Sequence, residues 1–299
     1  EAVSEMIRSG ELARALCALA AAGMRGVLMK GAALAHTIYA SPCLRPRADA
    51  DLLVHERDRE AAERVLARCG YTRAPRIAGK RIEYQAPYYR DAHGLRHVID
   101  LHWRVFNRQV LADRFPFDEL AARAVRVPAI AEAARALDPV DALLVACLHA
   151  PAHHRGQRRP LVEAYDAHRL ASDFAPDDWR ELARRAAARG VRRLCLRGLR
   201  EAQRRFGTAL PGHVVDAFSD ADSERERSAR LLGAGRSDPF WNDVRAIPGW
   251  TGRLRFLYEA AFPSAAFVSH QYGVRSRALL PLLYLHRGVT GLFRRSLAR

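Results

Sequence analysis

The stretch GVLMKGAALAHTIYASPCLRPRADADLLV, residues 26–54, decides the fold of the first half of the chain. Its apolar start predicts a short buried strand over residues 27–29, and the small residues that follow predict a helix over residues 31–39. A loop with two prolines then leads into a second apolar strand, residues 49–54. The stretch therefore predicts a strand–helix–strand unit in which the helix begins directly where the first strand ends.

Two carboxylates open the second of these strands. Alternate residues of a strand share a face, so Asp49 and Asp51 are expected side by side, with Ala50 and Leu52 toward the core. Adjacent carboxylates repel each other unless a cation lies between them, and a divalent metal is the commonest such cation. The pair therefore predicts a metal site.

The junction Lys30-Gly31 predicts a place for phosphate. Lys30 and Lys80 are the only lysines in the chain, and nearly all the other positive charge is arginine. A compact ammonium beside the free N–H groups of a helix start suits a phosphate chain. Arg45 in the next loop is a second candidate for binding phosphate, and Arg47 is a weaker one.

A third carboxylate is expected on a hairpin further along the chain. Residues 81–89 and 95–105 read as strands joined by a turn at residues 91–94. On the returning strand Asp100 and His102 share one face, and an aspartate between apolar neighbours is costly unless it is paired or binds a metal. Asp100 is therefore the predicted third metal ligand, and His102 is a supporting candidate.

The chain has 299 residues, of which 49% are hydrophobic and 27% charged, as in a globular protein with a sizeable core. The fold class expected is mixed α+β: a small sheet with flanking helices over residues 1–115, then a mostly helical domain over residues 116–299. The helices expected there are 118–125, 139–154, 160–173, 177–188, 190–206, 211–232, 252–261 and 275–295, with an irregular connection at 237–252.

The net charge of +16 raises the question of a nucleic-acid partner. The arginines are mixed with acidic residues along helices, as on a solvated face, so nucleic acid stays open but is not favoured. The densest apolar run, residues 278–285, is too short for a bilayer and contains Pro281, so no membrane is expected. Five scattered cysteines without zinc-ligand spacing indicate a reduced, cytoplasmic protein.

Histidines near the end of one helix form a second polar group. His149 and His153 are four residues apart on one face, but Ala150 stands where a metalloprotease needs glutamate. A role between helices is expected instead, with Asp166 as a candidate partner. Asp166 could equally reach a substrate.

Several segments together resemble one known family. They are LMKGAALAHTIYASPCLRPRADADLLV, IDLHWRV, DPVDALLVACLHAPAHH, AYDAHRLA and DDW, spread over residues 23–207. The chain resembles the uncharacterised bacterial nucleotidyltransferases of the DNA polymerase β superfamily. This resemblance implies a minimal catalytic core followed by a helical domain. It implies that Gly31 is the glycine of the family's phosphate-binding turn, that Asp49 and Asp51 are the paired metal ligands, and that Asp100 is the third carboxylate. Ala32 departs from the pattern, because it lacks the hydroxyl common at that position.

The expected activity is transfer of a nucleoside monophosphate from a nucleoside triphosphate to an acceptor hydroxyl or phosphate, with release of pyrophosphate. Two Mg²⁺ ions are the expected cofactors. The acceptor would be a small molecule, a peptide or a protein. Three alternatives remain open: phosphoryl transfer on the same site, nucleotide addition to an RNA end, and a non-catalytic, antitoxin-like binding module.

Overall fold

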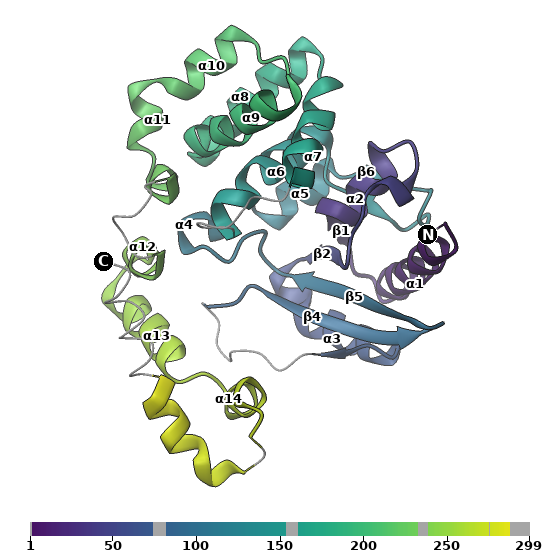
Figure 1. Cartoon of the computed structure of the whole chain (residues 1–299), viewed down its shortest axis with the longest axis vertical. Coiled ribbons are helices and arrows are strands. Elements are labelled where there is room, and N and C mark those ends of the chain that lie inside the picture. Colours follow the sequence, from purple (N-terminus) through teal and green to yellow (C-terminus); the bar gives the residue numbers. More distant parts are fainter. Residues whose placement is uncertain (1, 74–81, 154–160, 233–238, 275, 288–299) are drawn as a thin grey trace.

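The structure, a computed structural model, describes residues 2–73, 82–153, 161–232, 239–274 and 276–287. At the centre of these residues lies one mixed sheet of seven strands in the order β3-β4-β5-β2-β1-β7-β6 (Figure 1). The strands are β1 (Gly26–Met29), β2 (Ala50–Val54), β3 (Thr72–Arg73), β4 (Gln85–Ala92), β5 (Leu95–His102), β6 (Val125–Arg126) and β7 (Arg135–Ala136).

The register of the three central strands brings the predicted site together. β2 runs antiparallel to β1 and parallel to β5, so Asp51 is paired with Met29 on one side and with Asp100 on the other. β4 and β5 form an antiparallel hairpin whose turn, His93-Gly94, has positive φ at both residues. The two carboxylates therefore stand on adjacent strands and on the same face of the sheet.

Helices cover both faces of the sheet. Leu28, Leu52 and Leu101 pack with α1 and α3 on one face, whereas Met29 and Leu53 pack with α6 to α9 on the other. The helices are α1 (Ala2–Ala21), α2 (Lys30–Thr37), α3 (Arg59–Arg68), α4 (Gln109–Ala112), α5 (Phe117–Arg123), α6 (Pro139–His153), α7 (Leu161–Ser172), α8 (Pro176–Arg189), α9 (Arg192–Phe206), α10 (Gly212–Ser219), α11 (Ala221–Arg225), α12 (Pro239–Ala246), α13 (Trp250–Ala261) and α14 (Ala265–Tyr272). Short 3-10 turns lie at Pro42–Leu44, Glu56–Asp58, Arg227–Leu232 and Arg277–Leu279, and a last helix spans residues 280–287.

The α+β fold class is confirmed, and the predicted helices from α5 to α9 lie within a few residues of their expected bounds. The later part of the chain is mostly helical, as predicted, but two short strands within it were not predicted: β6 and β7 extend the sheet, and β7 pairs in parallel with β1. Strands of two residues are too short to show alternation in a sequence. The division into two domains at residue 115 stays a prediction.

The later part of the chain differs most from expectation. The helix expected over 211–232 is split into α10, α11 and a 3-10 turn, because Asp220 ends one helix and caps the next through the N–H of Ser223. The segment expected to be irregular contains α12, and α14 was not foreseen. Of the helix expected over 275–295, the structure describes a 3-10 turn and the helix 280–287, and the remainder lies outside the described residues.

Figure 1 shows α12, α13 and α14 extending beyond the helical layer as an arm. Asp243 attaches the arm to the core, since its carboxylate accepts hydrogen bonds from Arg108 at 3.0 Å and from the backbone N–H of Gln109 at 2.9 Å. Within the described ranges, no helix combines the length and the apolar character that crossing a bilayer requires.

Candidate functional site

The turn from β1 into α2 directs a lysine at the carboxylates. Lys30 has φ of +52°, a left-handed conformation that costs a residue with a side chain about 1–2 kcal/mol. Its ammonium reaches Asp51 Oδ1 at 2.7 Å. The N-cap residue of α2, Met29, makes no side-chain hydrogen bond to the first N–H groups of this helix. Strain held at such a place is typical of functional sites.

Gly31 is buried behind this lysine. A Cβ at Gly31 would meet the guanidinium nitrogens of Arg45 and the Cβ of Arg47 at 3.5 Å, which is ordinary van der Waals contact. Its φ is not in the left-handed region. The conformation of the turn therefore depends on Lys30, whereas Gly31 keeps space beside the two arginines.

Three side chains converge in front of Lys30. Asp51 and Asp100 are only 6% and 8% exposed, and His102 is fully buried. His102 Nε2 lies 2.9 Å from Asp51 Oδ1 and 3.3 Å from Asp100 Oδ2. One ligand atom from each of the three residues lies within 4.8 Å of the other two. His102, expected as a supporting residue, thus lies at the centre of the group.

The charges of this group are coupled. Burial opposes ionisation of Asp51, but Lys30 and His102 outweigh it and hold the pKa of Asp51 well below its usual range. Burial likewise opposes protonation of His102, whereas its hydrogen bonds to Asp100 and Asp51 raise its pKa. The site thus favours an ionised Asp51.

Asp49 lies at the mouth of the group. Asp49 as a whole residue is exposed to solvent, but the protein around its carboxylate limits the hydration of that group. This desolvation, followed by repulsion from Asp51 and Asp100, raises the pKa of Asp49. Among the described residues no ion pair or hydrogen bond reaches its carboxylate. Three carboxylates and one ammonium leave negative charge in excess.

A chain of hydrogen bonds orients Asp100. The N–H of Tyr84 donates to Asn107 Oδ1 at 2.7 Å, and Asn107 Nδ2 donates to Gln85 Oε1 at 3.1 Å. Gln85 Nε2 then donates to Asp100 Oδ2 at 2.6 Å. Because a backbone N–H can only donate, it sets the direction of both amides. Asp100 Oδ1 is buried and has no hydrogen-bond partner in the described part of the chain.

Both arginines of the preceding loop are held by carboxylates. Arg45 donates to Asp166 through Nε at 2.9 Å and Nη2 at 2.7 Å, and Tyr39 donates to the same carboxylate at 2.6 Å. Arg47 forms an ion pair with Glu5. Asp166 is therefore the partner of Arg45 rather than of His149. Both arginines still line the site, and their binding of phosphate stays a prediction.

A pocket of about 320 Å³ opens over the carboxylates. Its lining is partly polar and partly apolar, and the apolar residues come from α2, the bend after β7, and α6. The polar lining includes Lys30, Arg45, Arg47, Asp49, Asp51, Gln85 and Asp100, and the apolar lining includes Ala33, Leu34, Leu137, Ala142, Val145 and Ala146. His149 and Glu163 also line the pocket, with His149 Nδ1 2.7 Å from Glu163 Oε1. The role between helices expected of His149 is thus seen with Glu163, and the side chain of His153 lies outside the described residues.

Gln85, Asn107 and Glu163 were missed by sequence reasoning. Gln85 begins its strand and is paired across the hairpin with His102, so only the register reveals its proximity to Asp100. The alternation of polar residues at the start of this strand was the one signal in the sequence that could have drawn attention to Gln85.

The donor set of the site fits a divalent cation. Asp49 lacks a cationic partner among the described residues, and Asp100 Oδ1 is buried without a hydrogen bond. Carboxylate oxygens carrying an excess of negative charge are the ligands that Mg²⁺ prefers. An uncompensated carboxylate group of this kind is costly unless a cation joins it.

Comparison with known proteins gives one strong match. Residues 2–207 match the family described as "Uncharacterised nucleotidyltransferase". No curated protein matches the chain. Among solved structures, that of the antibiotic-resistance factor ANT(2'')-Ia is similar with a TM-score of 0.43 and 13% identity, over 62% of this chain and 92% of that one. A likeness this distant establishes neither fold nor function.

Proposed function

Because the chain belongs to the family of uncharacterised nucleotidyltransferases, we propose that it moves a nucleoside monophosphate from a nucleoside triphosphate to an acceptor hydroxyl or phosphate. The observation that carries this proposal is the pairing of Asp51 with Asp100 across β2 and β5, in front of Lys30. A pure binding module gains nothing from holding like charges together, whereas two-metal nucleotidyl transfer uses clustered carboxylates to hold its ions. The acceptor would belong to a small molecule, a peptide or a protein.

Asp49, Asp51 and Asp100 are the residues that would hold two Mg²⁺ ions. When bound, such ions neutralise phosphate charge and make an acceptor hydroxyl more acidic. His102 would keep Asp51 and Asp100 oriented through its hydrogen bonds to both. Lys30 forms an ion pair with Asp51 and would contribute positive charge on the side of the site where the phosphates bind.

Asp100 is the group that would take the proton. Gln85 and His102 occupy its Oδ2, whereas the second oxygen, Oδ1, has no hydrogen-bond partner among the described residues. The acceptor oxygen would attack the α-phosphorus, forming one P–O bond while the bond to the leaving pyrophosphate breaks. The hydroxyl proton would pass to Asp100 Oδ1. Gln85 is thus a positioning residue in this proposal, and not a catalytic one.

The N–H groups at the start of α2 and the ammonium of Lys30 would receive the phosphates. Arg45 would act mainly by position, because its guanidinium is already engaged by Asp166 in a buried pair. This pair joins the loop before Asp49 to α7 and so relates the carboxylates to the helical layer.

The test is transfer of label from nucleotides with Mg²⁺ and cell extract. Label at the α-phosphate should appear in an acceptor, and Asp51→Asn should lower the rate by about 10³-fold, or about 4 kcal/mol. The matched control is Asp222→Asn, since Asp222 is exposed and, among the described residues, pairs only with Arg225. Transfer of label from the γ-phosphate alone would indicate a kinase. Appearance of the label in RNA would indicate an RNA-end activity. Absence of both label transfer and nucleotide binding would contradict the proposal.

A further inference from the structure

The helix α13 carries an apolar stripe on its solvent side. Trp250, Leu254, Tyr258 and Phe262 are between 55% and 75% exposed. At 100° per residue these four positions fall within a sector of about 120°. We call them the α13 face. Most of the large apolar side chains that the described structure leaves exposed lie between Trp241 and Leu285, on the arm that includes this face.

The α13 face is not the side by which the helix folds. Gly252, Phe256 and Glu259 are buried on the opposite side, where Phe256 packs with Val244 and Ile247 of the α12 region. The arm is thus held by a separate small core. An additional aromatic stripe toward water is unfavourable unless a partner covers it.

Arginines border the stripe on both edges. Arg253 places its guanidinium 5.5 Å from the ring centroid of Trp250, and Arg255 lies at the other edge, with 55% of its side chain exposed. Glu259 is the only acidic residue between positions 244 and 287, and it is buried and bonded to Arg255. The described residues between positions 244 and 287 therefore carry positive charge without an exposed carboxylate.

We propose that the α13 face docks on an anionic lipid bilayer, lying in the interface without crossing it. Interfacial helices combine tryptophan, tyrosine and leucine on one side with arginines at its edges. The arginine stems can lie along the apolar surface while their charges reach the headgroups. This role is separate from the transfer reaction and does not depend on it.

Two other occupants fit the observations less well. A second copy of the chain would bring Arg253 and Arg255 against the same residues across a twofold axis, where like charges repel. A nucleic acid would stack on the aromatic rings, but it would gain little from exposed leucines such as Leu254 and Leu282.

The test uses the full chain with two kinds of vesicle, one of phosphatidylcholine alone and one with equal parts of phosphatidylcholine and phosphatidylglycerol. Co-sedimentation should show affinity at least about tenfold higher for the anionic vesicles, and added salt should weaken it. The double variant Leu254→Ser with Tyr258→Ser should lower that affinity by about tenfold or more. The control is Val3→Ser with Met6→Ser, which changes two exposed apolar residues of α1 and should leave the affinity unchanged.

Circular dichroism verifies that each variant is folded, and Arg253→Gln, at one edge of the α13 face, should reduce binding to anionic vesicles only. Equal affinity for both vesicles, or no affinity for either, overturns the proposal. So does an unchanged affinity of the folded Leu254/Tyr258 variant. Dimerisation or binding of an RNA oligonucleotide that this variant abolishes, without vesicle binding, would assign the face to those partners instead.

Discussion

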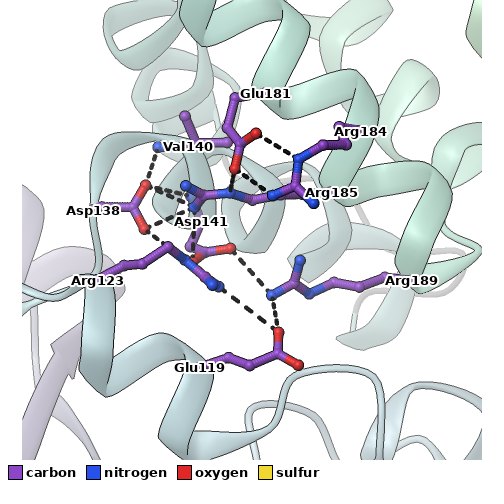
Figure 2. A network of polar contacts seen from close by, with 9 residues as sticks. All are labelled: Glu119, Arg123, Asp138, Val140, Asp141, Glu181, Arg184, Arg185 and Arg189. Carbon is purple, nitrogen blue, oxygen red and sulfur yellow. Dashed lines mark hydrogen bonds and ion pairs between the residues drawn. The ribbon is translucent and has the colours of Figure 1, made fainter.

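Two clusters of carboxylates and cationic side chains in this protein differ in their charge balance. In the first, shown in Figure 2, every carboxylate meets an arginine; we call it the arginine cluster. Its members are Glu119, Arg123, Asp138, Asp141, Glu181, Arg184, Arg185 and Arg189, with the backbone of Val140. The second is the candidate site around Asp51 and Asp100, where carboxylates outnumber the lysine that faces them.

The geometry of the arginine cluster is that of a structural tie. Arg185 donates to both oxygens of Asp138 at 2.9 and 2.8 Å, and Arg123 donates to Asp141 Oδ2 at 2.8 Å. Asp138 also accepts from the N–H of Val140 at the start of α6. The cluster joins α5, α6 and α8. Positive and negative side chains are equal in number, so there is no charge left for a ligand.

Charge balance separates the arginine cluster from the candidate site. Burial and short contacts occur in both, and so does a buried oxygen without a hydrogen bond, Asp141 Oδ1 in the first and Asp100 Oδ1 in the second, so none of these identifies a site. An excess of one sign and an adjoining pocket occur together at Asp100. Breaking the first cluster should therefore cost stability, whereas altering the second should cost activity.

The largest effect is expected in the arginine cluster. Arg185→Met keeps most of the side-chain volume but leaves Asp138 and Asp141 short of a cation, so unfolding free energy should fall by about 3 kcal/mol. Urea unfolding measures it. The control is Arg184→Met, on the same helix and exposed, which should change stability by less than about 1 kcal/mol. If both variants lowered the unfolding free energy by the same small amount, the arginine cluster would not have the structural role assigned to it.

The next effect sharpens the assignment of Gln85. Gln85→Leu removes the donor that occupies Asp100 Oδ2, so kcat should fall by about 10- to 100-fold with little change in the KM of the nucleotide. Binding of Mn²⁺ in calorimetry should weaken in parallel. The control Gln109→Leu removes an amide that bonds Tyr84 but does not touch Asp100. A raised KM with kcat retained would contradict a positioning role.

A smaller effect distinguishes repulsion from pairing. Asp49→Asn removes one of three mutually repelling carboxylates, so in the presence of EDTA the variant should be more stable than the wild type by up to about 1 kcal/mol. Added Mg²⁺ should stabilise the wild type and leave the variant nearly unchanged. Thermal unfolding in both conditions measures this. A loss of stability in EDTA would mean that Asp49 has a cationic partner after all.

The smallest effect concerns pH. Hydrogen bonds from Arg184 and Arg185 lower the pKa of Glu181 to about 2, against the burial that opposes them. A carboxylate with a lowered folded-state pKa contributes stability above its unfolded value of 4.5, and this contribution is lost as the pH falls toward 2. Glu181→Gln should flatten that part of the stability curve, measured by unfolding between those pH values. If the stability of the variant fell with pH as steeply as that of the wild type, the loss of stability at low pH would come from groups other than Glu181.

The sequence by itself predicted which residues form the candidate site. Asp51 and Asp100 could be found because local alternation assigns each side chain to a face of its strand. Lys30 could be found because it is one of two lysines in the chain and precedes Gly31 at a helix start. The start of a helix directly after Met29 could likewise be read from composition. The family of the chain followed from the same segments, and the match over residues 2–207 confirms it.

Only the tertiary structure decided which of these residues meet. The register that sets Asp51 opposite Asp100, and brings Gln85 across from His102, depends on pairing between segments far apart in the chain. Capture of Arg45 by Asp166 joins residues 121 positions apart. Alternation has a period of two along one strand and carries no information about its neighbour, so the partners of the carboxylates appear only once the sheet has formed.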